Sequence, residues 1–244
     1  MSYLKHIEYN EGVNIQRGLV RGTYGVNKFG YNPAVPSNAT ETIWDGSNLY
    51  TYIVTPGTAL VTSSNTTADN GGTVFVSGLD SNYNLVEELL TIGGPAGSVV
   101  FKRVFRAVMV TATTGDANVG TVTITVDAKS AAIISVGYGQ SLMAIYTVPL
   151  NHTGYLLQLD LGSQKDLENE FSIVIRNGTS GNVWATKDFI SHRGGFVEKS
   201  YPVPVVIPQK HDIEVRARSS ATGAVSAGFS LIVVQDTFVE SRRV

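Results

Sequence analysis

The sequence predicts an all-β protein, with two β-sandwich or jelly-roll-like domains that follow an extended N-terminal arm. Short apolar segments alternate with polar residues at a period of two, and turn residues recur at roughly 8–12 residue intervals, as in sandwiches. Charged residues make up only 16% of the 244 residues, and 25 residues are glycine, a composition typical of strands and tight turns. No segment keeps a helical period for more than a turn or two.

Residues 1–40 are predicted to form the arm. Glycine and proline interrupt residues 1–36 so often that we expect neither a helix nor a long strand there. The segment nevertheless carries more apolar side chains than a solvated tail does. We therefore expect it to become ordered against a neighbouring subunit, with a disordered terminus as the alternative interpretation.

Residues 41–130 are predicted to form the first sandwich. Residues 73–79 and 85–92 flank a polar turn at 80–84 and predict a hairpin. Strands are also expected over 101–111 and 121–126, the second of which places its apolar residues Val122, Ile124 and Val126 on one face. The small and polar residues 128–132 predict a domain junction.

Residues 131–238 are predicted to form the second sandwich, and residues 239–244 a C-terminal tail. The expected strands cover 142–148, 154–161, 171–176, 183–190, 203–207, 213–217 and 229–234. Three prolines in 201–208 predict an edge strand, because proline cannot donate a hydrogen bond to a neighbouring strand.

Catalytic and metal-binding patterns are missing from the sequence. It contains no cysteine, and its four histidines, at 6, 152, 192 and 211, have no ligand-like spacing. Gly137-Tyr138-Gly139 lacks the third glycine and the following helix of a dinucleotide-binding loop. Residues 80–84 resemble half of an EF-hand loop, but Leu85 replaces the required glycine, so an Asx-rich turn is expected. We expect a non-enzymatic protein with no catalytic residues, no metal and no cofactor.

The charge and hydropathy patterns limit the possible partners. A formal net charge of −2 predicts no binding to nucleic acid. No run of about eighteen apolar residues predicts a membrane span, and the N-terminal residues are too polar for a signal peptide. The absence of cysteine suits synthesis in a reducing cytoplasm.

Three parts of the chain have distinctive sequences: KFGYNPAVPSNATETIWDGSNLYTY at 28–52, GLDSNYNLVEELLTIGG at 78–94, and the segments 139–149 and 207–234. They resemble virion structural proteins of tailed bacteriophages, especially those with marine and cyanobacterial hosts. These motifs are strands and turns, and they contain no catalytic signature. Some members of this group are capsid decoration or cement proteins with sandwich or jelly-roll folds.

The resemblance implies a protein of the virion, made in the host cytoplasm. The leading hypothesis is a capsid decoration protein, a homotrimer that binds the major capsid protein outside the head. One alternative is a tail, neck or baseplate component. Another is a receptor-binding or carbohydrate-binding module, which would need exposed aromatic side chains on one rim. Under the leading hypothesis, deletion of residues 2–36 is expected to leave a soluble fold that no longer binds capsids.

The candidate interaction residues lie in the arm and at its exit. They are Tyr24, Phe29, Tyr31, Pro33, Ile43, Trp44 and Tyr50. Each could instead pack within the core of its own chain, and for Trp44 that alternative is favoured.

Overall fold

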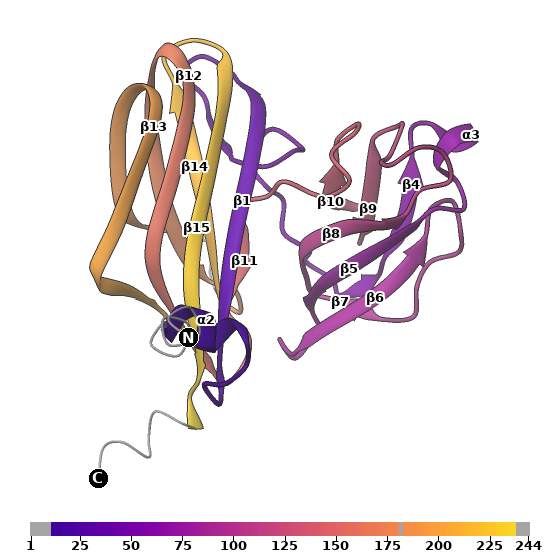
Figure 1. Ribbon diagram of the computed structural model, residues 1–244, viewed down its shortest axis with the longest axis horizontal. Helices are drawn as coiled ribbons and strands as arrows, with labels where there is room; N and C mark the ends of the chain where they lie inside the picture. The colour runs from indigo at the N-terminus through magenta and orange to yellow at the C-terminus, as the bar shows by residue number, and fades with distance from the viewer. Residues whose placement is uncertain (1–10, 181–182, 238–244) are drawn as a thin grey trace, which may run out of the picture.

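The computed structural model describes residues 11–180 and 183–237, except for the side chain of residue 165. Its strands form two bodies that lie side by side (Figure 1). The described helices are short: α2 (Glu11–Gln16) and α3 (Thr66–Asp69). The prediction of an all-β fold is confirmed. None of the described helices has the length and apolar character needed to cross a membrane.

The larger body is an antiparallel sheet that curls until it is nearly closed. Its hydrogen-bonded order is β1-β15-β12-β14-β11, while β13 pairs with β12 and β2 pairs with β14. The strands are β1 (Thr23–Val35), β2 (Thr40–Thr42), β11 (Ile145–Thr147), β12 (His152–Asn177), β13 (Ala185–Ile207), β14 (His211–Ser219) and β15 (Gly223–Gln235). The inward side chains form one continuous core.

The curl of this sheet comes from irregularities in its two longest strands. The first half of β12 pairs with β15 and its second half pairs with β14. Between them the register shifts from Ser163 to Glu168, and Asp166 has a positive φ of 64°. On β13, Gly194 and Gly195 lie opposite this shift with φ of 59° and 82°. These bulges let both strands bend, so segments predicted as separate strands are halves of β12 and β13.

The smaller body consists of three small sheets with the orders β10-β9-β4, β3-β7 and β6-β5-β8. The strands are β3 (Gly57–Thr58), β4 (Leu60–Ser63), β5 (Thr73–Leu79), β6 (Leu85–Thr91), β7 (Val100–Phe101), β8 (Arg103–Thr111), β9 (Val122–Val126) and β10 (Lys129–Ile134). The predicted hairpin is confirmed as β5 and β6. In its turn, the Asp80 carboxylate accepts hydrogen bonds from the N–H groups of Asn82 and Asn84, at 2.8 and 2.9 Å. The expected Asx-rich turn is therefore present.

The prediction that residues 1–36 contain no helix or long strand is wrong. Helix α2 lies there, and the 13-residue strand β1 pairs with β15. Gly30 is required for packing rather than for a turn, because a Cβ atom there would lie 2.2 Å from the Ile43 carbonyl oxygen. Pro33 is accommodated at an irregularity between Asn32 and Val35. Residues 1–10 and the predicted tail at 239–244 lie outside the described residues.

Two further predictions from the sequence concern the small residues at 128–132 and the proline-rich segment 201–208. The small residues at 128–132 are not a linker, because they belong to the hairpin of β9 and β10. Asp127 and Ala128 form its turn with positive φ angles of 52° and 54°. The proline-rich edge strand is confirmed, because β13 pairs only with β12 among the described strands. Its residues 201–204 have no register partner on β12, so the prolines interrupt no ladder.

Candidate functional site

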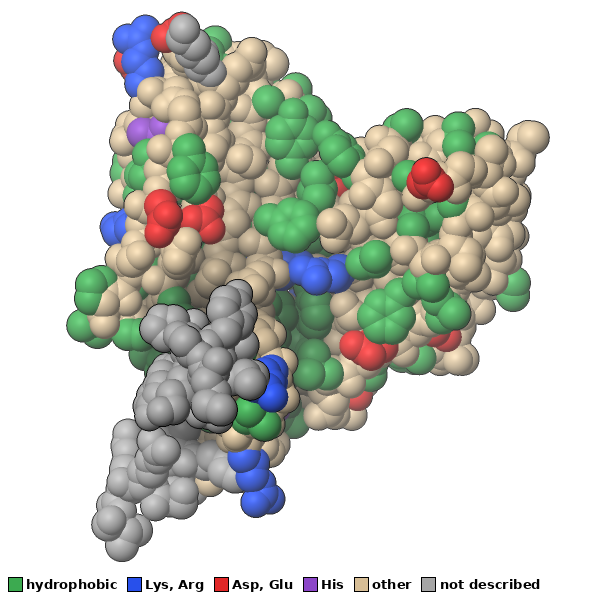
Figure 2. All heavy atoms as spheres, in the orientation of Figure 1, with side chains coloured by type: hydrophobic (Ala, Val, Ile, Leu, Met, Phe, Trp, Pro, Cys, Tyr) green, Lys and Arg blue, Asp and Glu red, His purple; other side chains and the backbone are tan. Residues whose placement is uncertain are grey.

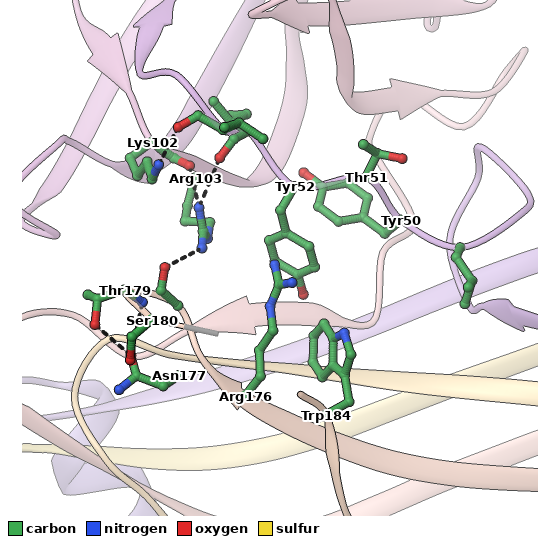
Figure 3. Close-up of a pocket in the computed structure, with 14 residues that line it drawn as sticks. Tyr50, Thr51, Tyr52, Lys102, Arg103, Arg176, Asn177, Thr179, Ser180 and Trp184 are labelled. Atoms are coloured by element: carbon green, nitrogen blue, oxygen red, sulfur yellow. Dashed lines mark hydrogen bonds between the residues drawn. The ribbon is translucent and has the colours of Figure 1, made fainter. Parts of the chain in front are cut away.

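The two bodies meet at a buried ion-pair network, whose residues Arg103 and Arg176 are labelled in Figure 3. Arg103 of β8 makes two hydrogen bonds to Asp212 of β14, with Nε–Oδ1 and Nη2–Oδ2 distances of 2.8 and 3.0 Å. Arg176, at the end of β12, also donates to Asp212 Oδ2 at 3.0 Å. Asp212 is fully buried, and it also accepts a hydrogen bond from the Thr147 hydroxyl at 2.7 Å. One carboxylate therefore links the smaller body to the larger one.

Aromatic rings enclose the cations of this network. The Arg176 guanidinium lies 4.2 Å from the ring centroid of Tyr52 and 4.6 Å from that of Trp184 (Figure 3). Glu214 accepts a hydrogen bond from the Tyr52 hydroxyl at 3.1 Å and pairs with Arg216. Burial raises the pKa of Glu214, and burial together with nearby carboxylates raises the pKa of Tyr52 well above 10.0.

The hollow beside this network has a volume of about 420 Å³. Its described lining contains no serine–histidine or paired-carboxylate arrangement, and both of its arginines are already paired with the carboxylate of Asp212. No described group of three or more His, Asp or Glu side chains has a geometry that could hold a metal ion. The network is therefore best interpreted as a structural connection between the two bodies.

Strand β1 makes a second connection between the bodies. The Lys28 ammonium is buried and donates to the carbonyl oxygen of Phe105 on β8. The Arg106 guanidinium donates to the carbonyl oxygen of Asn27 at 2.9 Å. Burial, with a smaller effect of the neighbouring Arg106 charge, lowers the pKa of Lys28 well below 10.5.

A groove of about 560 Å³ lies on the outer face of the larger sheet, where that face meets the smaller body. Its floor is β15, whose outward residues there are Ser226, Gly228 and Ser230. Strands β1 and β12 pair with β15 on either side, and β13 follows β12. Figure 2 shows hydrophobic side chains on this face of the molecule, at the boundary between the two bodies. The small floor residues leave a depression between larger side chains.

Aromatic side chains form both walls of the groove. Phe29 and Tyr31 of β1 stand on one side, together with Tyr138 from the loop between β10 and β11. Phe196 of β13 stands on the other side. The rings are accessible, with exposed fractions of 41% for Phe29, 50% for Tyr138 and 67% for Phe196. In the sheet register, Tyr31 pairs with Ser226, Ser226 with Gly162, and Gly162 with Phe196.

The Tyr138 loop is held by a buried asparagine. Asn118, only 2% exposed, donates from its amide to the carbonyl oxygens of Gly120, Ile134 and Ser135 at 2.7, 3.2 and 2.9 Å. Its side-chain oxygen accepts from the N–H of Gly139 at 3.1 Å. The glycines on either side of Tyr138 have φ of 77° and 66°, which lets the loop turn sharply at this residue. The Tyr138 and Tyr31 rings then meet edge to face, with centroids 6.4 Å apart.

Polar groups lie between the aromatic walls. Asp160 of β12 lines the groove, and its Oδ1 atom accepts a hydrogen bond from Gln158 at 2.9 Å. Within the described part of the chain, Asp160 Oδ2 has no hydrogen-bond partner. The Ser230 hydroxyl donates to Asn27 Oδ1 at 2.9 Å, which leaves the Asn27 amide group free to donate.

The seven predicted interaction residues fall into three groups. Phe29 and Tyr31 lie in the groove, whereas Pro33 is exposed outside its lining and Tyr24 is half-buried, with its hydroxyl 3.3 Å from that of Tyr146. The other three are core residues, as the alternative interpretation expected, and their side chains cannot serve as exposed anchors: Ile43, Trp44 and Tyr50.

The sequence analysis did not select three residues that line the groove: Tyr138, Asp160 and Phe196. Only the folded sheet brings them beside β1. Flanking glycines were the one local signal for Tyr138.

Asp45 fastens the same loop from its other side, and this contact predicts a pH dependence. Its carboxylate accepts from the N–H of Leu142 at 2.6 Å and from the hydroxyl of Ser135 at 3.1 Å. Burial raises the pKa of Asp45 to about 6 from 3.8. Because the folded state holds the proton more tightly, this group destabilises the fold as the pH rises from about 4 to about 6.

We expect the Asp45→Asn variant to lack this part of the pH dependence. Above pH 6 it should be more stable than the unmodified chain, by an amount on the order of 1 kcal/mol after allowance for solvent screening. Urea unfolding of both proteins between pH 4 and pH 8 measures the difference, in which all other titrating groups cancel. A difference that does not change with pH would contradict the prediction.

Comparisons with known proteins give no family assignment. No protein-family model matches the chain, and no curated protein matches its sequence. Among solved structures, it is similar to that of infectious bursal disease virus, Gx strain, at 13% identity and a TM-score of 0.27, over 88% of this chain and 71% of that one. The VP2 subviral particle of infectious bursal disease virus matches at 10% identity and a TM-score of 0.23, over 88% and 73% of the two chains. Likeness at these TM-scores carries no argument about function.

Proposed function

We propose that this chain is a non-enzymatic structural component of a phage particle, namely a decoration protein on the outside of the capsid. The observation that carries the proposal is the exposed apolar surface of the edge strand β13. Its exposed fractions outside the groove are 56% at Phe189, 83% at Val203 and 53% at Val206. These apolar side chains are exposed although the same strand carries charged residues and prolines, and such an apolar surface is suited to binding another protein.

The resemblance of residues 28–52, 78–94 and the C-terminal segments to phage virion proteins supports the same proposal. In it, β13 contacts the major capsid protein or a second copy of this chain, and the chain assembles as a homotrimer. Repetition over an icosahedral lattice adds avidity to individually weak contacts. A tail, neck or baseplate component is the alternative, and it would form rings around an axis instead.

The location is tested by gold labelling of intact virions with a nanobody against this chain, read by electron microscopy. Label over the whole head is expected. Label confined to the tail or to one vertex would overturn the capsid assignment and favour the alternative.

The role of β13 is tested with a double variant, Val203→Lys and Val206→Lys. Both side chains are exposed, so the fold should survive, whereas two charges on the edge should reduce binding to purified heads by about tenfold or more. Co-sedimentation with heads lacking this protein measures the binding. Val110→Lys on β8, where the valine is 57% exposed, is the matched control and should bind normally. Equal binding by the double variant would exclude β13 as the contact.

A further inference from the structure

The glycine on the floor of the groove, Gly228, is not enforced by a severe steric clash. Glycine inside a strand destabilises it relative to alanine, and often marks a place where a ligand approaches closely. A Cβ atom at Gly228 would meet the Lys28 carbonyl oxygen at 3.2 Å and Asp160 Cβ at 3.6 Å. The neighbours would therefore have to move only slightly for a side chain at this position. Its absence keeps the groove open between Phe29 and Asp160, which flank Gly228 in the register.

We propose that this groove is a carbohydrate-binding site, in which a short glycan lies across β15 between the two aromatic walls. Sugar rings have apolar C–H faces and hydroxyl edges, and the groove offers a partner for each. The rings of Tyr138 and Phe196 provide exposed flat surfaces for the apolar faces. Asp160 Oδ2 can accept from a sugar hydroxyl, and the Asn27 amide and Ser226 hydroxyl can donate.

The floor favours a glycan over an extended peptide. Strands β15 and β12 each have hydrogen-bonded neighbours on both sides, so their backbone cannot accept an added strand. A ligand must be recognised through side chains alone. The carboxylate of Asp160 also disfavours an apolar protein surface, because covering an unpaired charged oxygen without a hydrogen bond is unfavourable. A hydroxyl-rich ligand meets both conditions.

The walls are held in place before any ligand binds. Tyr138 stands on a loop fixed by the four hydrogen bonds of Asn118, and Phe29 and Tyr31 stand on a paired strand. Few side chains therefore have to become ordered when a ligand binds, and the entropy cost of binding is small. This is important for sugars, because their contacts with proteins are weak and shallow. This inference does not depend on where the protein sits on a virion.

The test is a titration of the full chain with soluble hexasaccharides of β-1,4-glucose, β-1,3-glucose and β-1,4-N-acetylglucosamine, and with purified lipopolysaccharide. Calorimetry at ligand concentrations up to about 1 mM is suitable for weak sites. We expect at least one probe to bind. Tyr138→Ala, Phe196→Ala and Asp160→Asn should each weaken that binding by about tenfold. Leu89→Ala is the control, because it removes an exposed apolar side chain from β6, outside the groove and away from β13, and should leave glycan binding unchanged.

Each outcome decides the proposal. Binding that is lost in the groove variants and kept in Leu89→Ala supports a glycan site. Binding that survives both Tyr138→Ala and Phe196→Ala overturns it, as does the absence of binding to every probe. If Tyr138→Ala or Asp160→Asn instead reduces only the binding to phage heads, the groove is a protein contact and the glycan assignment is wrong. Tyr138 and Asp160 do not belong to β13. A loss of head binding in their variants can therefore be distinguished from a loss of the β13 contact.

Discussion

Deletion of residues 2–36 is expected to prevent the chain from folding. It removes β1, the terminal strand of the larger sheet, which pairs with β15 from Thr23 to Val35. The loss exposes the β15 edge and takes away Val35 and the half-buried Tyr24 and Val26 from the core. Burial of such side chains contributes about 1.5–3 kcal/mol each, against a total stability of about 5–15 kcal/mol for a typical domain.

Circular dichroism and gel filtration of the purified truncation measure this effect, and an aggregated or unfolded product is expected. Deletion of residues 2–10 is the control, because it leaves β1 and its pairing with β15 in place. A soluble Δ2–36 protein with a cooperative thermal transition would show that β1 is dispensable. The structure thereby reverses the expectation drawn from the sequence, in which the same deletion leaves a soluble fold without capsid binding.

This reversal shows which parts of the fold could be predicted from sequence. The hairpin of β5 and β6 was predictable because its pairing is local and its polar turn has a recognisable Asx pattern. Strand β1 was not, because its partner lies some two hundred residues later in the chain. Its glycines were interpreted as turn residues, whereas Gly30 is there because the neighbouring backbone leaves no space for a side chain. Sequence alone cannot distinguish these two uses of glycine.

The same limit applies to the groove. Phe29 and Tyr31 could be selected as candidates because they lie in one aromatic segment. Phe196 and Asp160 belong to the groove only through the register of β12 with β13 and β15. The bulges that set this register at 163–168 were predicted as breaks between strands, so no sequence argument could bring the two residues together. Exposed aromatic residues on one rim were nevertheless the stated requirement for a carbohydrate-binding module.

Replacement of Asp212 by asparagine is expected to destabilise the protein by about 3–5 kcal/mol, since it leaves two buried arginines without a counter-charge. Asp212 is fully buried, and the side chains of Arg103 and Arg176 are only 4% and 14% exposed. Asparagine has nearly the same shape, so the loss measures charge and hydrogen bonding rather than a cavity. Glu170→Gln is the control, because its partner Arg218 lies 3.9 Å away and both side chains are about half exposed. Such a surface pair should contribute no more than about 1 kcal/mol.

Urea unfolding of the two variants, followed by far-ultraviolet circular dichroism and tryptophan fluorescence, measures these effects. Arg103 belongs to the smaller body and Asp212 to the larger one, so the variant should also weaken the coupling between them. We expect the two probes to coincide for the unmodified chain and to separate for Asp212→Asn, with the weaker body unfolding first. A loss below about 1 kcal/mol with coincident transitions would mean that Lys28 and the β1 contacts suffice to hold the bodies together. In that case the Arg103–Asp212 pair would add specificity of docking without stability, which is the other established role of buried ion pairs.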